Sequence, residues 1–339
     1  MTPLINNKFN VIIQYICKYT VMRTPALSNH FKSREPSPIR LAQIKHMKRT
    51  DGVSAINVAI GNVSLPMHPA MQKRMFELNS TNSPFKDGVV KYSATVGFEE
   101  TNKAFLNIIA SSGAKTDTLY SQVTEGGSQA MELVVLGTAG LIEDQDRPIL
   151  LIDPAYTNYI SMAERTNRKT ISVSRKVQPN SKFSIPSISE IEEAILNHNP
   201  SAILVIPYDN PTGHFYSQED LIELGRLAVK HNLWIISDES YRELFYTDHE
   251  ASSIWKLSNK EVAGIEGRRI SLETASKVWN ACGLRIGAIV TDNQEFHQRC
   301  VAENTANLCP NVIGQYIFGA LAHESKEDLQ KWYNSQRRY

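Results

Sequence analysis

The sequence predicts an α/β fold, a three-layer α/β/α sandwich around a mostly parallel sheet. Short apolar runs recur along the chain, and each is continuous rather than alternating, which is typical of strands covered on both faces. The clearest runs are residues 149–152, 202–206, 233–236 and 286–290. Helical patterns lie at residues 128–141, 188–197, 217–231 and 293–306. Strands that alternate with helices favour a parallel sheet with helices on both faces.

The segment 217–231 shows the helical signal most clearly. Leu221, Leu224 and Ala228 recur at helical spacing and form an apolar stripe. Ser217 and Asp220 supply a cap and a first-turn acid, so the helix is expected to begin at this point.

Composition excludes several classes of protein. The 339 residues suggest about two domains. Lys and Arg number 36 and Asp and Glu number 35, and the resulting net charge of +1 argues against nucleic acid as the main partner. With 42% apolar and 21% charged residues, the chain can bury a large core and is not expected to be disordered.

The cysteines and the N-terminal apolar stretch indicate where the protein resides. The four cysteines form no C-x-x-C pair, so we expect no metal site and read them as reduced thiols of a cytoplasmic protein. Residues 11–21 are interrupted by Gln14 and Lys18, which makes them too short and too polar to span a bilayer. Met22 is an alternative start to Met1.

Chemically informative residues follow five of the expected strands. In parallel α/β sheets, ligands bind beyond the carboxyl ends of the strands. The five segments are Gly126-Gly127-Ser128-Gln129, Asp153-Pro154-Ala155-Tyr156, Tyr208-Asp209-Asn210-Pro211-Thr212-Gly213, Asp238-Glu239-Ser240-Tyr241 and Ser276-Lys277. We therefore expect one site at this edge of the sheet.

Lys277 lies between an apolar strand and Val278-Trp279, with Arg285 close behind in the sequence. A partly desolvated lysine beside a cation suits Schiff-base chemistry, whereas a solvated surface lysine is the alternative. The surrounding segment reads Ser276-Lys277-Val278-Trp279-Asn280-Ala281-Cys282-Gly283-Leu284-Arg285-Ile286-Gly287. It resembles the Schiff-base signature of class I/II aminotransferases, which are pyridoxal-phosphate enzymes of fold type I.

The resemblance implies roles for the other strand-end residues toward pyridoxal phosphate. Asp238 would hold the protonated pyridine nitrogen, which makes the ring an electron sink. Asn210 and Tyr241 would hydrogen-bond the phenolic oxygen, and Tyr156 would stack on the ring. The alternatives are a helix cap for Asp238, a turn for Asn210 and Tyr241, and loop packing for Tyr156.

The phosphate would be held by backbone N–H groups, hydroxyls and an arginine. The residues implied for this are Gly127, Ser128, Gln129, Ser276 and Arg285. Tyr92 resembles the family tyrosine that reaches the neighbouring subunit's phosphate, which implies a homodimer with a shared active site; an ordinary surface aromatic is the alternative. Gly61 corresponds to the glycine beside the substrate carboxylate, but Asn62-Val63-Ser64 departs from the family pattern after it.

The resemblance also implies a domain organisation. Residues 1–55 would form an N-terminal arm and the start of a small domain, and residues 56–320 the large pyridoxal-phosphate-binding domain. Residues 321–339 would begin an exposed helix leading to a C-terminal small domain that we expect to be absent from this chain. Arg337 and Arg338 are read as solvated helix residues rather than as a clamp for the substrate carboxylate.

The function implied is an aminotransferase that moves an amino group between an amino acid and a 2-oxo acid through Lys277. A β- or γ-lyase on the same scaffold would share every cofactor contact, so the sequence does not separate the two. A truncated form that binds the cofactor with little activity is a third reading. A cofactor-sensing transcription regulator is disfavoured, because the residues before 56 show no helix-turn-helix pattern.

Overall fold

A computed structural model describes residues 25–56 and 63–339 of the chain. The chain divides into two compact units, residues 1–62 and residues 63–339. In the first unit the described helices are α2 (Asn29–Lys32) and α3 (Pro38–Met47). The hydroxyl of Ser37 accepts a hydrogen bond from Arg40 N, and Pro38 occupies the first turn, so the sequence itself starts α3 there.

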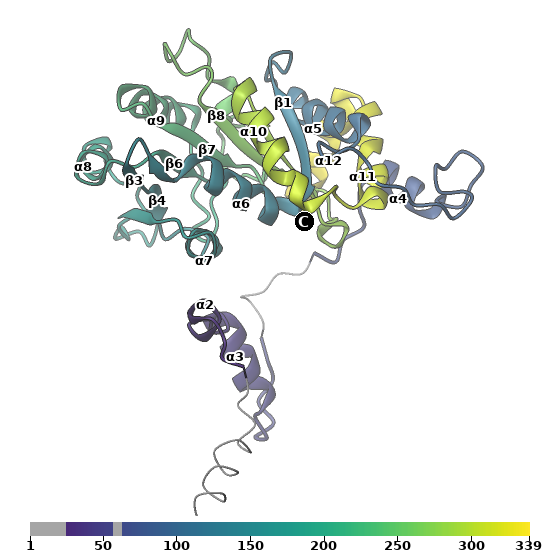
Figure 1. Cartoon of the computed structure of the whole chain (residues 1–339), viewed down its shortest axis with the longest axis horizontal. Helices are drawn as coiled ribbons and strands as arrows, with labels where there is room; N and C mark the ends of the chain where they lie inside the picture. Colours follow the sequence, from purple (N-terminus) through teal and green to yellow (C-terminus); the bar gives the residue numbers. More distant parts are fainter. Residues whose placement is uncertain (1–24, 57–62) are drawn as a thin grey trace, which may run out of the picture. The chain divides into compact units, whose positions relative to one another are not determined.

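The second unit is built on a seven-stranded sheet with the order β1-β9-β8-β7-β6-β4-β5 (Figure 1). The strands are β1 (Tyr120–Glu125), β4 (Ile149–Asp153), β5 (Thr170–Ser174), β6 (Ala202–Val205), β7 (Trp234–Asp238), β8 (Arg269–Thr274) and β9 (Ile286–Thr291). β4 to β8 pair in parallel, whereas β9 runs antiparallel to both β8 and β1. The mostly parallel sheet expected from the sequence is therefore confirmed. A separate hairpin joins β2 (Gly140–Ile142) to β3 (Gln145–Arg147).

Helices cover both faces of the sheet, which confirms the three layers. They are α4 (Pro69–Phe76), α5 (Glu99–Ser111), α6 (Gly126–Thr138), α7 (Asn158–Arg165), α8 (Ile188–His198), α9 (Gln218–Lys230), α10 (Gln294–Asn304), α11 (Val312–Gly319) and α12 (Lys326–Arg338). One core cluster packs α8 and α9 against the sheet, and a second packs α6, α7 and α10 against it. A third joins α4, α5, α11 and α12 beside β1 and β9. Short 3₁₀ turns are Ile254–Lys256, Cys282–Leu284, Thr305–Asn307 and Ala320–His323.

The continuous apolar strands have a simple explanation in β4. Leu150 and Ile152 belong to the cluster on the α8/α9 side, whereas Ile149 and Leu151 belong to the cluster on the α6/α7 side. Successive strand residues point to opposite faces, and both faces are covered here. The same logic makes the sequence signal strong for central strands and weak for edge strand β5, which was not predicted.

The boundaries of the expected helices lie within three residues of those observed. The helix expected at 128–141 begins at Gly126 and ends at Thr138, because the chain turns into the β2–β3 hairpin at Gly140. The helix expected at 217–231 spans Gln218–Lys230. Its predicted start is confirmed, since Ser217 and Asp220 form a capping box.

Helix α12 corrects one expectation about the end of the chain. We expected an exposed helix, but Leu329 and Tyr333 are fully buried. Arg337, expected to be solvated, lies 4.7 Å from the ring centroid of Phe245 and 3.6 Å from the Glu243 carboxylate. Arg338 is exposed, as expected. The helix therefore packs on the second unit along one face.

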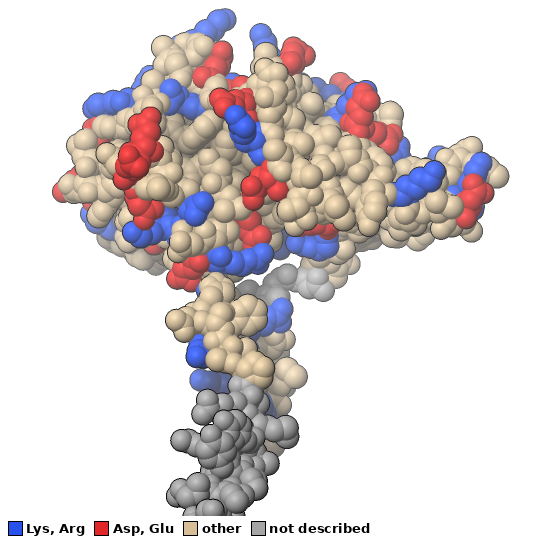
Figure 2. Space-filling view, viewed as in Figure 1, with Lys and Arg blue, Asp and Glu red and all other residues tan. Residues whose placement is uncertain are grey.

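The distribution of charged side chains is consistent with the near-zero net charge of the sequence. On the face shown in Figure 2, basic and acidic side chains are interspersed. Among residues 25–56 and 63–339, no helix is long and apolar enough to cross a membrane.

Candidate active site

The sheet topology brings the expected strand-end residues to one edge. The carboxyl ends of the parallel strands lie at this edge, and β9 begins there because it runs the opposite way. Glu125 at the end of β1 pairs with Ile286 at the start of β9. Arg285, which precedes β9, therefore lies beside the start of α6.

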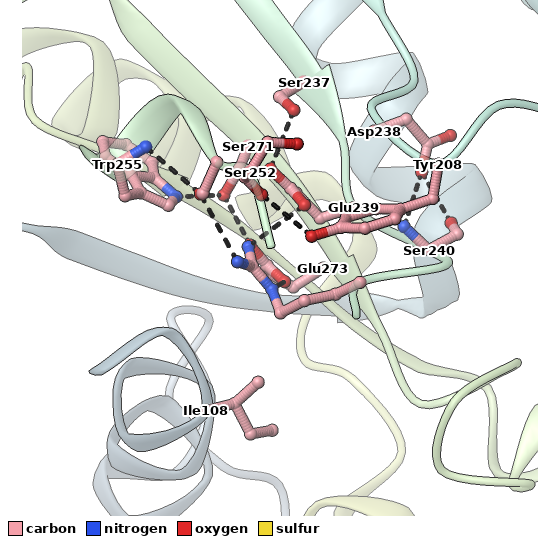
Figure 3. Close-up of polar contacts among 12 residues, drawn as sticks. Ile108, Tyr208, Ser237, Asp238, Glu239, Ser240, Ser252, Trp255, Ser271 and Glu273 are labelled. Carbon is pink, nitrogen blue, oxygen red and sulfur yellow. Dashed lines mark hydrogen bonds and ion pairs between the residues drawn. The ribbon is translucent and has the colours of Figure 1, made fainter. Parts of the chain in front are cut away.

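Asp238 ends β7, and both of its carboxylate oxygens accept hydrogen bonds. Tyr159 OH donates to Oδ2 at 2.6 Å. Ser240 donates to Oδ1 from its hydroxyl at 2.6 Å and from its backbone N at 3.0 Å (Figure 3). The carboxylate is thus fixed in direction and remains half-buried. Tyr159, on α7, was missed from the sequence because a tyrosine in a helix gives no signal for a partner on a distant strand.

The turn after β7 contacts the loop after β6 through a side-chain hydrogen bond. Asn210 Nδ2 donates to Tyr241 OH at 3.2 Å, so two of the expected site residues are in direct contact. Burial raises the pKa of the Tyr241 phenol, and the nearby Asp238 carboxylate raises it further.

Tyr156 lies in the same group. Burial and the Asp238 carboxylate raise the pKa of its phenol, while the Arg285 guanidinium lowers it, so the ring lies near both charges. Its ring centroid is 5.5 Å from that of Tyr159 in a T-shaped arrangement. The ring is thereby held by Tyr159 while Tyr156 remains partly exposed.

The first turn of α6 and Arg285 form a candidate anion site. A Cβ added at Gly126 would lie 2.7 Å from Arg285 Nη2, so the guanidinium rests directly against the start of the helix. Gly287 is required for this approach, since its own Cβ would lie 2.6 Å from the Gly126 carbonyl carbon. The unpaired N–H groups and positive dipole of a helix start favour an anion at this point.

Four other expected phosphate contacts lie in or close to this turn. Gly127 and the exposed Ser128 are in the first turn of α6. The side chain of Gln129 accepts a hydrogen bond from Glu125 N at 2.7 Å, across the start of the helix. Ser276 accepts a hydrogen bond from the Thr274 hydroxyl at 2.8 Å and lies half-buried next to Lys277.

Lys277 follows β8 and is half-buried. No hydrogen bond or ion pair joins its ammonium group to another residue in the described part of the chain. Its place directly after β8 puts Lys277 at the same edge of the sheet as Asp238.

One expected residue, Tyr92, does not contact this group. Tyr92 is 80% exposed and makes no hydrogen bond or ring contact with the strand-end residues described above. Gly61 and the neighbouring Asn62 lie outside the described residues. Within the described ranges, no group of three or more His, Cys, Asp and Glu side chains could hold a metal ion.

A buried charge cluster, formed by Glu239, Arg242 and Glu273, lies behind the turn that carries Asp238 and Tyr241. Arg242 Nη2 is 2.6 Å from Glu273 and 3.6 Å from Glu239. Ser237 donates to Glu239 at 2.9 Å and Ser271 donates to Glu273 at 2.7 Å (Figure 3). The cluster fixes the backbone on either side of Asp238.

Comparisons with known proteins agree with this arrangement. The family described as "Aminotransferase class I and II" matches residues 56–339. The aspartate aminotransferase of Thermotoga maritima is 28% identical over 268 residues, covering 78% of this chain and 65% of its own length. The glutamate-pyruvate aminotransferase of Escherichia coli is 25% identical over 285 residues, covering 82% and 66%. The chain thus spans about two thirds or less of the length of these curated relatives.

The fold is shared with solved structures. A double mutant of Thermus thermophilus aspartate aminotransferase aligns with a TM-score of 0.75 at 21% identity, over 93% of this chain and 77% of that one. At this identity the likeness supports the fold alone. The family match covers most of the chain, includes every strand-end residue described above and agrees with the resemblance seen around Lys277. The chain is therefore a member of the class I and II aminotransferase family.

Proposed function

We propose that this chain binds pyridoxal phosphate at the strand ends and forms the cofactor-binding part of an aminotransferase acting on an amino acid and a 2-oxo acid. The observation that supports the proposal is that the Tyr156 ring lies near both the Asp238 carboxylate and the Arg285 guanidinium. A fixed carboxylate and a candidate anion site then lie near one aromatic ring.

The side chains present fit the cofactor. The carboxylate of Asp238, held by Tyr159 and Ser240, suits a protonated ring nitrogen. The first turn of α6 with Arg285 suits a phosphate. Pyridoxal phosphate supplies an electron sink when bound, and it does so only while its ring nitrogen keeps its proton.

Each residue would have a separate role toward the bound cofactor. Asp238 would hold the proton on the ring nitrogen, Asn210 and Tyr241 would hydrogen-bond the phenolic oxygen, and Tyr156 would stack on the ring. Lys277 Nζ would hold the cofactor's aldehyde carbon and would take and return the proton at the substrate's α-carbon as general base and acid.

We also propose that the protein works as a homodimer in which Tyr92 reaches the partner's phosphate. The exposure of Tyr92 and of Val89 and Val90 nearby supports this, because exposed apolar residues of one segment suit a protein interface. Sedimentation of the purified protein tests the oligomeric state, and a monomer at micromolar concentration would contradict the proposal.

The direct test of the function is to trap the cofactor. The purified chain is incubated with pyridoxal phosphate, reduced with borohydride and digested, and the modified lysine is mapped by mass spectrometry. We expect a single adduct on Lys277, lost in Lys277→Ala and kept in Lys103→Ala, a control on the exposed face of α5. An adduct on another lysine, or none, would overturn the assignment. A screen of amino donors with and without an oxo-acid acceptor then measures transfer, and ammonia release without an acceptor would indicate a lyase instead.

A further inference from the structure

Arg175 is a buried arginine at the same edge of the sheet, outside the residues discussed so far. It directly follows β5 and is 7% exposed. The β4–β5 register pairs Asp153 with Ser174, so Arg175 leaves the sheet beside the loop that follows β4. Its backbone N donates to Asp153 O at 2.7 Å.

The guanidinium of Arg175 contacts two different loops. Nη1 donates at 3.0 Å to Ile152 O near the end of β4 and at 3.0 Å to Pro154 O in the loop after it. Nη2 lies 3.3 Å from the Asp209 carboxylate, in the loop after β6, and donates to Tyr216 OH. One side chain therefore connects two loops whose strands, β4 and β6, pair last at Leu150 and Ile203.

The two loops carry the residues that we assign to the cofactor ring. Pro154 lies two residues before Tyr156, and Asp209 directly precedes Asn210. The Arg175 and Asp209 side chains are almost completely buried, so each depends on the other for its charge. A shift of either loop would break this pairing.

We propose that Arg175 is a positioning residue, which sets the distance between Tyr156 and Asn210 so that both face one cofactor ring. The inference rests on the proposed function, because it assumes that these two residues bind the ring. Arginine is needed because its planar fork donates in several fixed directions at once. A lysine would keep the charge beside Asp209 but could not hold both carbonyl groups and Tyr216 in the same geometry.

The chain offers a matched control in Arg269, the first residue of β8. It is 6% exposed, lies 2.7 Å from the Asp292 carboxylate, donates to backbone carbonyl groups and lies 5.2 Å from the ring centroid of Trp255. Its chemistry therefore matches that of Arg175, but it lies at the opposite end of the sheet.

The experiment compares Arg175→Lys with Arg269→Lys in the full chain, using two readouts. The first is hydrogen exchange of the backbone amides in 153–158 and 209–213 without cofactor. The second is the dissociation constant of pyridoxal phosphate from absorbance titration. We expect Arg175→Lys to speed exchange in both loops together and to weaken cofactor binding at least about tenfold, and Arg269→Lys to leave both readouts within about twofold of the wild type.

The outcomes separate the inference from the proposed function. Unchanged exchange in the two loops of Arg175→Lys, or equal losses of affinity in both variants, would overturn the positioning role. A second outcome is that the wild-type chain binds no pyridoxal phosphate while Arg175→Lys still speeds exchange in both loops. This outcome would keep the coupling of the two loops through Arg175 and would overturn the proposed function. If Arg175→Lys does not fold, Asp209→Asn, which keeps the shape and removes the charge partner, must give the same two effects, and its failure to do so counts against the proposal.

Discussion

Two buried arginines lie at the candidate site, and they differ in their charge balance. Arg175 pairs with one carboxylate, that of Asp209, and donates its other hydrogen bonds to backbone carbonyl groups and to the Tyr216 phenol. Arg242 faces two carboxylates, Glu239 and Glu273. The first cluster is electrically neutral, whereas the second carries one excess negative charge when both acids are ionised.

The difference shows in the pKa of the acids. Burial raises the pKa of Asp209, and Arg175 opposes the change. Burial raises the pKa of Glu239 to about 7, and although Arg242 opposes this, Glu273 and Asp238 add to it. A neutral cluster can serve as a fixed connection between loops, whereas a cluster with excess charge gains or loses a proton near neutral pH.

The largest expected effect comes from removing Arg242. In Arg242→Met two buried carboxylates lose the cation that pairs with both of them, and breaking such a pair costs about 3–5 kcal/mol of unfolding free energy. Arg175→Met leaves one buried carboxylate, Asp209, without its cation. By the same reasoning we expect its loss of unfolding free energy to be about 1–2 kcal/mol smaller. Urea unfolding of both variants at pH 8 measures the difference.

A second substitution checks the cause of that loss. Adding Glu273→Gln to Arg242→Met removes one of the two unpaired carboxylate charges. The double variant should recover about 1–2 kcal/mol of unfolding free energy. Equal losses in the two single variants, or no recovery in the double variant, would show that charge balance does not distinguish the clusters.

The next effect is a pH dependence specific to Glu239. Its pKa in the folded chain is about 7, above the ordinary 4.5 that it has in the unfolded chain. Between these values the folded chain keeps a proton that the unfolded chain has released, so stability falls as pH rises through this window. Glu239→Gln removes the titration, and its stability relative to wild type should rise by about 3 kcal/mol from pH 4 to pH 8. Urea unfolding across that range measures it, and a difference that stays constant with pH would exclude the assignment.

The sequence predicted the residues that obey local patterns. The central strands, the capped helix at Ser217 and the strand-end positions of Asn210, Asp238 and Lys277 were all found, because apolar runs and their ends are local signals. The roles of these residues toward the cofactor stay predictions, and Gly61 lies outside the described residues.

The buried polar residues that hold the site residues in place could not be predicted in the same way. Arg175, Arg242 and Tyr159 are polar residues whose partners lie on other strands or loops. In the sequence, a buried arginine looks like a solvated one, because its burial follows from tertiary packing. Arg337 shows the same limit, since it was read as solvated and instead contacts Phe245 and Glu243.

The smallest expected effect concerns Tyr159, which lies between the two clusters. Burial, its hydrogen bond to Asp238 and the charge of Asp209 hold the pKa of its phenol well above the usual range, so it stays a donor. Tyr159→Phe removes one donor from Asp238 while both hydrogen bonds from Ser240 remain, so we expect a stability loss of about 1 kcal/mol. Cofactor binding should weaken by about threefold, because a carboxylate held on one oxygen is less well directed at the ring nitrogen.

The matched control for this variant is Tyr208→Phe. Tyr208 is also buried, and its hydroxyl donates to Ser252 O at 2.9 Å rather than to Asp238 (Figure 3). Both variants lose one buried hydrogen bond, so their melting temperatures should fall alike. Absorbance titration with pyridoxal phosphate should separate them, with weaker binding in Tyr159→Phe alone. Equal affinities would mean that Ser240 is sufficient to direct Asp238, and the contact between Tyr159 and Asp238 would then matter for stability and not for the cofactor.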